Sequence, residues 1–569
     1  MSGPFDSPWK GKNKILLSID IGLTHSTVSF VYLEKGVKPT LHTVREWPGE
    51  EGDKSASVVP TIAWYDITNK AVAIGAEACL HRIEERAKDE GWFLAKEFKT
   101  HLYPEDATNQ PNQKINALPF GVSLGQIYSD FLGYLLDHTK SYFEDHIIDG
   151  AQIWESYKET MEVVMSYPDG WGAREQSFLR DAAMRAGLST VDMGLSNIRF
   201  LTDAWASAYY CLYNVTLTSK PKTGDVLLLC DARDATTSIS LHRVDLTNPI
   251  PKMSTCDLQY LKIGLTSVDA AAENHIRQTM GCAGISPKDV DEFARAGTED
   301  FKKNVKFTFG NEKKEYPVQV SNAQYNNSAL KTRRGRMALP GAVVASFFGS
   351  FVEAVVHEAI DRLIKGTVHI FLLGYFGNSP YLQRVISDRY EPGGHRVTTL
   401  AINSASRAIA YGALISDFSA GAGCRPHRSL GIETSCGSWL EIAAKGVLVN
   451  PGTEIKKPVS LKYPTSNPEL NDLELRFLTY TKVAEVAQTR DAKGVLLNGF
   501  SKWFVLSANL SPLSKALVRT LGTNNVIHWR LNFHVCVRFG EKGLEAYLEW
   551  EEKGGRQTSP ATIWPDYEL

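Results

Sequence analysis

Two stretches of the chain, residues 15–30 and residues 226–241, share one pattern of apolar and polar positions. Each begins with an apolar run that ends in an aspartate, Asp20 or Asp231, and continues through a short turn into an alternating run. Alternation with a period of two is typical of a half-buried strand. The pattern therefore predicts two equivalent β-hairpins, each with a carboxylate at its rim.

Strand and helix patterns alternate on both sides of the second hairpin, which is typical of α/β folds. The helix pattern near 125–145 places Ile127, Phe131 and Leu135 on one face. The expected elements are strands within 14–65, a helix at 125–145, a strand at 163–166, a helix that ends at Gly187, a helix at 343–364 and a strand at 368–373.

The helical periodicity mostly disappears beyond a stretch of small residues at 419–426. Apolar and polar residues alternate there instead, at 475–480, 503–507, 526–533, 535–539 and 544–550. This change predicts a linker followed by a β-rich, sandwich-like unit.

The composition, 22% charged and 43% hydrophobic over 569 residues, is that of a globular protein with several lobes. A net charge of -2 provides no general attraction to nucleic acids or acidic membranes. The cysteines are scattered without metal-binding spacing, and no apolar stretch approaches the roughly 18 residues of a membrane span. We therefore expect a cytoplasmic protein with neither nucleic acid nor a membrane as its partner.

The turn of the first hairpin has the residue types that hold a phosphate. Gly22 lets the backbone approach an anion, and successive N–H groups from Gly22 to His25 can form an anion-binding nest. The carboxylate of Asp20 can reach Mg²⁺ directly or through its waters. Many hairpins contain this motif by chance, so its duplication and a further motif carry the argument.

That further motif is the Gly-x-x-Gly turn formed by Gly374, Tyr375, Phe376 and Gly377, which follows an apolar strand. Ser379 and Pro380 then open a helix. Such a turn lets the backbone lie flat against a purine while a helix N-terminus faces polar groups. A plain strand-to-helix turn is the alternative.

Taken in order, these segments resemble the heat-shock protein 70 family of the actin-like ATPase superfamily, and within it the divergent member-12 branch. The resemblance covers about residues 14–415. The segments that carry it are Asp20 to Ser26, Trp47 to Gly49, Val59 to Thr61, Ala73 to Ala78, Glu97 to Lys99, Val163 to Pro168, Arg180 to Leu188, Asp231 onward, Glu299 to Lys303, Gly374 to Gly377 and Ala408 to Leu414.

The resemblance implies a two-lobed actin-like ATPase fold, built from duplicated ribonuclease-H-like lobes and followed by the β-rich unit. The expected division is a disordered N-terminus at 1–13, lobe I at 14–222, lobe II at 223–372, a return segment that closes the nucleotide cleft at 373–418, a linker at 419–430 and a β-rich domain at 431–569.

The resemblance also implies a site for ATP or ADP with Mg²⁺. Asp20 and Asp231 would lie near the metal, mainly through water. Lys99 would lie near the γ-phosphate, where a cation offsets developing charge. The remaining implied contacts are Gly22, Leu23, Thr24 and His25 with the phosphates, Glu299, Lys302 and Lys303 with adenine and ribose, and Gly264, Gly374, Tyr375, Phe376 and Gly377 elsewhere on the nucleotide.

The chain departs from the family at the second phosphate turn and at the catalytic carboxylate. The family's three glycines and threonine are replaced by Arg233, Asp234, Ala235 and Thr236, and its second bracketing aspartate by Ser238. Thr202, at the expected start of a helix at 201–206, replaces the catalytic glutamate, with Asp203 beside it. Loss of the glycines hinders close backbone approach to a phosphate. The side chain of Arg233 is an alternative phosphate contact.

Three hypotheses follow. The first is an ATP-binding, heat-shock-70-like protein with slow ATP hydrolysis, whose lobe closure is coupled to the β-rich domain in a chaperone or protein-interaction role. The second is a pseudo-ATPase scaffold without turnover, and the third, weaker one is a metabolite kinase of the same superfamily. The chain ends without the family's helical lid, so we expect a clamp that releases a peptide quickly, or no clamp at all. Sheet edges can still add a strand from a peptide or protein client, and a purely structural sandwich is the alternative.

Overall fold

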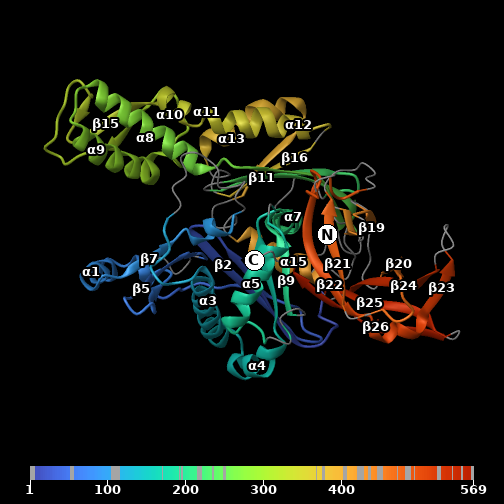
Figure 1. Cartoon of the computed structure of the whole chain (residues 1–569). Helices are drawn as coiled ribbons and strands as arrows, with labels where there is room; N and C mark the ends of the chain where they lie inside the picture. The colour runs from blue at the N-terminus through green and yellow to red at the C-terminus, as the bar shows by residue number, and fades with distance from the viewer. Residues whose placement is uncertain are drawn as a thin grey trace.

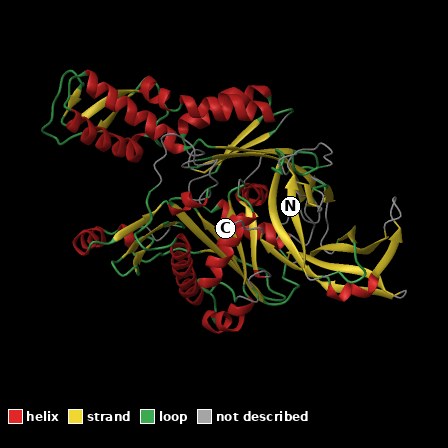
Figure 2. Cartoon of the chain, viewed as in Figure 1, coloured by secondary structure: helices red, strands yellow, loops and turns green. Residues whose placement is uncertain are grey.

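The computed structural model of the chain is a mixed α/β protein with several sheets (Figures 1 and 2). It describes residues 5, 7–50, 57–103, 116–169, 171–190, 193, 197–214, 221–233, 236–247, 252–366, 368–374, 379–400, 407–419, 429–433, 437–444, 453–468, 470, 472–480, 488–491, 494–521, 527–540, 543–552 and 555–565.

The first sheet contains the first predicted hairpin. Its strands are β1 (Lys14–Ile21), β2 (His25–Leu33), β3 (Leu41–Thr43), β4 (Val59–Pro60), β8 (Glu162–Tyr167) and β9 (Ile198–Thr202). Their order is β3-β2-β1-β8-β9, and β4 pairs with β2. β1 is antiparallel to β2 and parallel to β8, which is parallel to β9.

The second sheet repeats this topology. Its strands are β10 (Val226–Ala232), β11 (Thr237–Leu246), β12 (Lys252–Leu261), β16 (His369–Gly374) and β17 (Arg396–Thr399), in the order β12-β11-β10-β16-β17. β10 is antiparallel to β11 and parallel to β16. Asp20 pairs with Thr27 and Asp231 with Ser238, at the same offset in the two hairpins. The sequence repeat is therefore a repeat of sheet topology and register.

Helices cover the outer face of each sheet (Figure 1). Ile127, Phe131 and Leu135 are buried, as their spacing predicts. On the first sheet the helices are α3 (Leu124–His146), α4 (Gly150–Tyr157) and α5 (Ala173–Arg185). On the second they are α11 (Gly349–Val352), α12 (Asp361–Leu363) and α13 (Pro380–Tyr390). The helices α8 (Leu265–Cys282), α9 (Pro287–Asp300) and α10 (Gly341–Phe347) extend beyond the second sheet and pack with one another and with strands in 315–340 (Figure 1).

The prediction of one continuous helix at 343–364 is wrong. The segment is divided into α10, α11, a π-helical stretch η5 (Glu353–Ile360) and α12, and it bends by 48° between Phe347 and Gly349. Glycine weakens a helix, and π-turns widen one, so both features interrupt the regular 3.6-residue path.

Two helices lie between the sheets, α7 (Asp203–Asn214) and α15 (Ala408–Ser419). Ala206 and Leu414 pack in a core with residues of β1, whereas Cys211 and Ile415 pack in a core with residues of β10. The two helices also contact each other along their lengths. The segment that we predict to return across the cleft thus ends in a helix shared by both halves.

Two small sheets lie outside these layers. One is formed by β5 (Ile62–Tyr65), β6 (Ala71–Ile74) and β7 (Phe93–Lys96), near α1 (His81–Glu90), and the other by β13 (Glu315–Gln319), β14 (Thr332–Arg333) and β15 (Arg336–Pro340).

Part of the N-terminal segment predicted to be disordered is packed, because the rings of Phe5 and Trp9 lie 4.6 Å and 5.2 Å from the ring of Phe418 in α15.

The C-terminal part consists of two five-stranded sheets around one core, to which Phe477 and Leu506 contribute from the first and Val535 and Leu548 from the second. The first has the order β19-β18-β21-β22-β27; the second has the order β20-β24-β25-β26, with β23 paired to β24. The strands are β18 (Ser429–Glu433), β19 (Trp439–Ala443), β20 (Glu454–Tyr463), β21 (Asp472–Tyr480), β22 (Phe500–Asn509), β23 (Leu517–Leu521), β24 (Ile527–Gly540), β25 (Gly543–Glu552), β26 (Gly555–Pro560) and β27 (Thr562–Pro565).

The segments 526–533 and 535–539, predicted as separate strands, form the single strand β24. Its alternation continues through His534, which is exposed between buried Phe533 and Val535. Most of the predicted linker at 419–430 lies outside the described residues, and β18 already begins at Ser429.

Within the described part of the chain, no single helix has the length and apolar character needed to span a membrane, although the bent pair Gly341–Phe347 and Gly349–Leu363 meets that test jointly. The described cysteines are free thiols.

Candidate functional site

The two repeated aspartates lie near the carboxyl ends of β1 and β10. Asp20 is 8% exposed and Asp231 is 5% exposed. Ser166, on the neighbouring parallel strand β8, donates its hydroxyl to Asp20 Oδ1 at 2.9 Å. Burial raises the pKa of Asp20, whereas the guanidinium of Arg233 acts in the opposite direction. The rims of both hairpins therefore belong to one buried charge cluster.

Arg233, the first residue of the unusual second turn, binds two carboxylates of this cluster. Its Nε donates to Asp231 Oδ2 at 2.9 Å, and its Nη1 lies 3.3 Å from Asp203 Oδ2. The side chain of Arg233 is 26% exposed, whereas those of Asp203 and Asp231 are 6% and 7% exposed. Burial alone would lower the pKa of Arg233, but these two aspartates and Asp20 raise it well above its usual value. The guanidinium therefore remains charged.

Lys99 brings a second cation to the cluster from the 3₁₀ helix η2 (Phe98–Leu102). It is 3% exposed, and its Nζ donates to the carbonyl oxygen of Ile21 at 2.5 Å. The ammonium also lies 5.3 Å from the centre of the Trp171 ring, a cation–π contact. Burial lowers the pKa of Lys99, and Asp203 and Asp20 oppose this effect. Lys99 therefore holds the first hairpin where its turn begins.

The predicted helix start at 201–206 is wrong in detail, because Thr202 is the last residue of β9 and α7 begins at Asp203. The hydroxyl of Thr202 accepts the backbone N–H of Trp205 at 3.4 Å, so Thr202 caps α7. The second carboxylate oxygen of Asp203, Oδ1, is buried without a hydrogen-bond partner among the described residues. Thr202 therefore lies just before the helix, and Asp203, the first residue of α7, faces Arg233.

Asp169 belongs to the cluster but was not predicted. It follows β8, is 6% exposed, and accepts the hydroxyl of Ser238 at 3.2 Å and the backbone N–H of Ala204 at 3.3 Å on Oδ2. Ser238 lies in the second sheet, so this bond joins the two halves. The signal was an aspartate near the carboxyl end of an apolar strand, the same signal that identifies Asp20 and Asp231.

A cavity of about 640 Å³ brings together residues that lie far apart in the sequence. Thr24 and His25 line it from the first hairpin, and Glu299, Lys302 and Lys303 line it from the second half. Lys302 Nζ donates to Glu299 Oε1 at 2.8 Å. The spacing of Glu299, Lys302 and Lys303 in the sequence is that of one face of an α-helix, but Lys302 and Lys303 lie in a π-helical turn, η4 (Phe301–Val305), that follows α9.

The cavity also contains residues that sequence reasoning missed, chiefly Lys306 and Phe307. Lys306 is buried and pairs with Asp269 at 2.9 Å, and its ammonium lies 5.2 Å from the centre of the Phe307 ring. Phe307 is 37% exposed and so presents an aromatic surface to the cavity. Lys303 has no ion-pair or hydrogen-bond partner in the described part of the chain.

Two glycines fit where a side chain would not. A Cβ on Gly22 would lie 2.0 Å from the carbonyl oxygen of His25. Gly374 has φ +68°, and a Cβ there would lie 2.7 Å from Asp231 Oδ1. Both glycines therefore allow the close backbone approach that the turn and the carboxylate require.

The other residues predicted to contact the nucleotide lie near the charge cluster or the first cavity. Leu23 is in the first turn, Thr236 accepts the N–H of Arg233 on its carbonyl oxygen at 2.9 Å, and Gly264 directly precedes the cavity residue Leu265. Asp234, Ala235, Tyr375, Phe376 and Gly377 lie outside the described residues.

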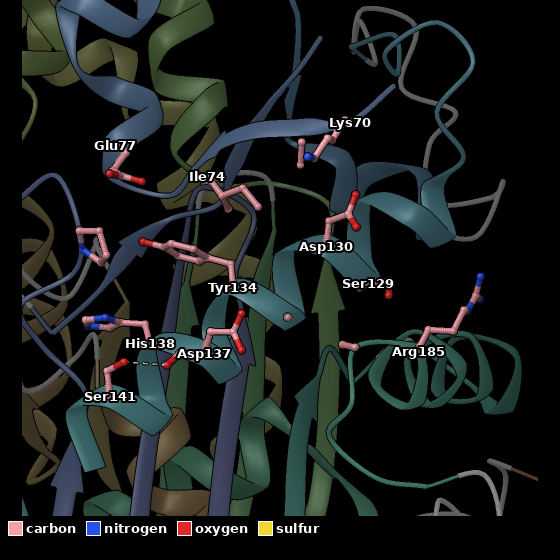
Figure 3. A pocket seen from close by; sticks show the side chains of 14 residues that line it. Lys70, Ile74, Glu77, Ser129, Asp130, Tyr134, Asp137, His138, Ser141 and Arg185 are labelled. Carbon is pink, nitrogen blue, oxygen red and sulfur yellow. Dashed lines mark hydrogen bonds between the residues drawn. The ribbon is translucent and has the colours of Figure 1, made fainter. Parts of the chain in front are cut away.

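A second cavity, of about 820 Å³, lies between α3 and the β5–β6 hairpin. Figure 3 shows Asp130, Tyr134 and Asp137 of α3 on one side of it and Lys70 and Ile74 on the other. Tyr65 donates its hydroxyl to Asp130 Oδ2 at 3.0 Å. The lining of this cavity includes none of the residues predicted to contact the nucleotide or the metal, so the first cavity is the better candidate.

The carboxylates predicted to lie near Mg²⁺ do not fit a divalent ion in this arrangement. Asp231 Oδ2 already accepts Arg233, and Asp20 Oδ1 accepts Ser166. Among the described residues, no three His, Cys, Asp or Glu side chains form a group that could hold a metal. Mg²⁺ requires oxygen ligands in nearly ideal octahedral geometry, and one carboxylate oxygen of Asp231 is already bound by the guanidinium of Arg233.

No model of a known protein family matches the chain, and no curated protein matches it. Function therefore has to be inferred from the chemistry of the site.

Proposed function

We propose that the chain is a nucleotide-binding protein of the heat-shock-70-like kind, with a two-lobed actin-like ATPase fold, which binds ATP or ADP and hydrolyses ATP slowly or not at all. The repeated topology of the two sheets supports the fold assignment, because both have the same strand order, orientation and aspartate position. The helices α7 and α15 between the sheets are a suitable hinge for lobe closure.

The observation that carries the proposal is the composition of the first cavity. The resemblance assigns Thr24 and His25 to the phosphates and Glu299, Lys302 and Lys303 to adenine and ribose, and all five line one cavity. Lysine ammonium groups suit phosphate oxygens as point charges. Phe307 adds an aromatic face on which a purine base can stack.

Slow or absent turnover is supported by the groups available to orient an attacking water. Thr202 supplies a hydroxyl that caps a helix, and Asp203 is paired with Arg233. The same features favour the pseudo-ATPase scaffold as the second candidate. Release of inorganic phosphate from ATP, measured over hours at excess protein, separates the two: slow release supports the ATPase, and none supports the scaffold.

The C-terminal sheets are the proposed place for protein or peptide clients, bound by strand addition in the cytoplasm. β20 and β26 are the terminal strands of one sheet, and β19 and β27 those of the other. α5 lies against β22 and β27, so the first lobe and this unit are in contact. That contact is a route for coupling lobe closure to the β-rich unit.

Thermal unfolding tests nucleotide binding directly. A ligand that binds only the native state stabilises it by about 2.7 kcal/mol at one hundred times its Kd. We therefore expect millimolar ATP or ADP to raise the Tm by several degrees, as measured by differential scanning fluorimetry. An unchanged Tm with both nucleotides would contradict the proposal.

Phe307→Ala should weaken ADP binding by about tenfold, because stacking of a base on an aromatic ring contributes about 1–3 kcal/mol. Isothermal titration would measure the change in Kd. Phe120→Ala is the matched control, since Phe120 is 84% exposed and does not line the cavity. Equal affinities for Phe307→Ala and wild type would remove Phe307 from the binding site.

A further inference from the structure

The second hairpin turn carries a fixed positive charge in the position where the first turn presents glycine. Arg233 joins Asp231, at the end of β10, to Asp203, at the start of α7. Asp20, from the first hairpin, is the next acidic group that acts on Arg233. Carboxylates from both halves of the molecule therefore surround one guanidinium.

The guanidinium retains unused donors. A guanidinium has five N–H bonds, of which Nε serves Asp231 and Nη1 faces Asp203. Nη2 has no hydrogen-bond partner among the described residues, and the side chain is 26% exposed. The Lys99 ammonium likewise donates one hydrogen bond, to the carbonyl oxygen of Ile21. Both cations can thus donate hydrogen bonds to further oxygen atoms.

Both cations are adjacent to segments that line the first cavity. The N–H of the cavity residue Leu265 donates to the carbonyl oxygen of Arg233 at 3.0 Å. Ile21, whose carbonyl oxygen accepts the Lys99 ammonium, precedes the turn that brings Thr24 into the lining. Neither cation lines the cavity itself, so the phosphates of a nucleotide with its base at Phe307 would have to extend past Leu265 and Thr24 to reach them.

We propose that Arg233 takes the place of the divalent cation, so that this protein binds the di- or triphosphate of a nucleotide without Mg²⁺. The guanidinium stays anchored to Asp231 and Asp203 and binds the phosphates through Nη2, as a planar donor suited to phosphate oxygens. Lys99 supplies the second charge. The inference rests on the proposed nucleotide-binding function and concerns how the phosphates are neutralised.

The test is the binding of ADP to the full-length protein, measured by isothermal titration once in excess EDTA and once with millimolar Mg²⁺. We expect the two Kd values to agree within about twofold. Binding that requires Mg²⁺ would overturn the role of Arg233 while leaving the nucleotide-binding proposal intact. Absence of binding in both buffers would overturn both proposals.

Variants at Arg233 provide the complementary readout. Arg233→Ala should weaken binding in EDTA by at least about tenfold, because a charge-assisted hydrogen bond is lost. Mg²⁺ should restore part of that affinity, since Asp231 and Asp203 are then free to hold an ion. Arg243→Ala is the matched control, because Arg243 lies on β11 with a side chain that is 57% exposed. An unchanged Kd in EDTA for Arg233→Ala would overturn the proposal. If this variant does not fold, the comparison of ADP binding by the wild-type protein in EDTA and in Mg²⁺ tests the proposal instead.

Discussion

Gly412→Ala will lower the free energy of unfolding by about 3 kcal/mol, because α7 and α15 cross too closely for a side chain at this position. A Cβ on Gly412 would lie 1.9 Å from the carbonyl oxygen of Ala206 and 3.1 Å from Cβ of Tyr210. The clash is with backbone, so rotation of a side chain cannot relieve it. Urea unfolding of the two proteins, followed by tryptophan fluorescence, measures the difference.

Gly133→Ala is the control for this prediction. Gly133 lies within α3, and a Cβ there would meet no atom within 4 Å. Alanine is the better helix former by about 1 kcal/mol, so this variant should be as stable as wild type or more stable. Similar stabilities for both variants would show that the two helices separate readily at Gly412. Since α7 and α15 pack against both sheets, the Gly412 variant should also lose nucleotide-induced stabilisation.

Asp169→Asn will raise stability at neutral pH and leave it unchanged in acid. Burial, and then the neighbouring Asp203, raises the pKa of Asp169 from 3.8 to about 6. The folded state therefore holds the proton more tightly than the unfolded state, and stability falls as the pH rises from about 4 to about 6. The full effect at pH 7 is about 3 kcal/mol.

Asparagine keeps an oxygen for the bonds from Ser238 and Ala204 but carries no charge. The free energy of unfolding of the variant relative to wild type should therefore grow between pH 4 and pH 7, and urea unfolding at each pH measures it. Asp181→Asn, on the exposed side of α5, controls for the general effect of removing a carboxylate. A difference that stays constant with pH would mean that Asp169 is ionised in the folded protein already at pH 4.

The arrangement of charges suggests why this site differs from one that uses a metal. Carboxylates from β1, β10 and α7 converge and would repel one another without a cation. Arg233 supplies that cation permanently and is tied to the backbone of the second turn. Under the proposal that Arg233 takes the place of the divalent cation, the site would need no ion from solution and would have no metal to polarise a phosphate. The proposed function, with slow or absent turnover, expects the same.

Several parts of the fold could be predicted because they depend on local periodicity. The two hairpins, the buried face of α3 and the strands of the C-terminal part follow from the spacing of apolar residues along single segments. The wrong predictions concern whether a helix or strand is interrupted or continuous, which the periodicity of apolar residues does not show. The bend between Phe347 and Gly349 divides an apolar helix, whereas the pattern that suggested two strands belongs to the continuous strand β24.

Several residues of the candidate site could be predicted from the sequence, whereas the contacts between them could not. Asp20, Lys99 and Asp231 could be singled out, since each lies in a recognisable segment. Phe307 could not, because nothing in a single exposed aromatic residue indicates that it lines a cavity. Asp169 carried the same strand-end signal as the two repeated aspartates, and its importance appears only through its bond with Ser238 in the other half.

By itself, the sequence determined that the chain contains a duplicated hairpin with a carboxylate in each copy and a β-rich end, because such patterns require only neighbours along the chain. Only the tertiary structure decided that Arg233 spans Asp231 and Asp203, and that Thr24 and Lys303 line one cavity. Those contacts join residues brought together by the packing of two sheets around α7 and α15. Electrostatic interactions depend on distance and burial in three dimensions, which the order of residues does not specify.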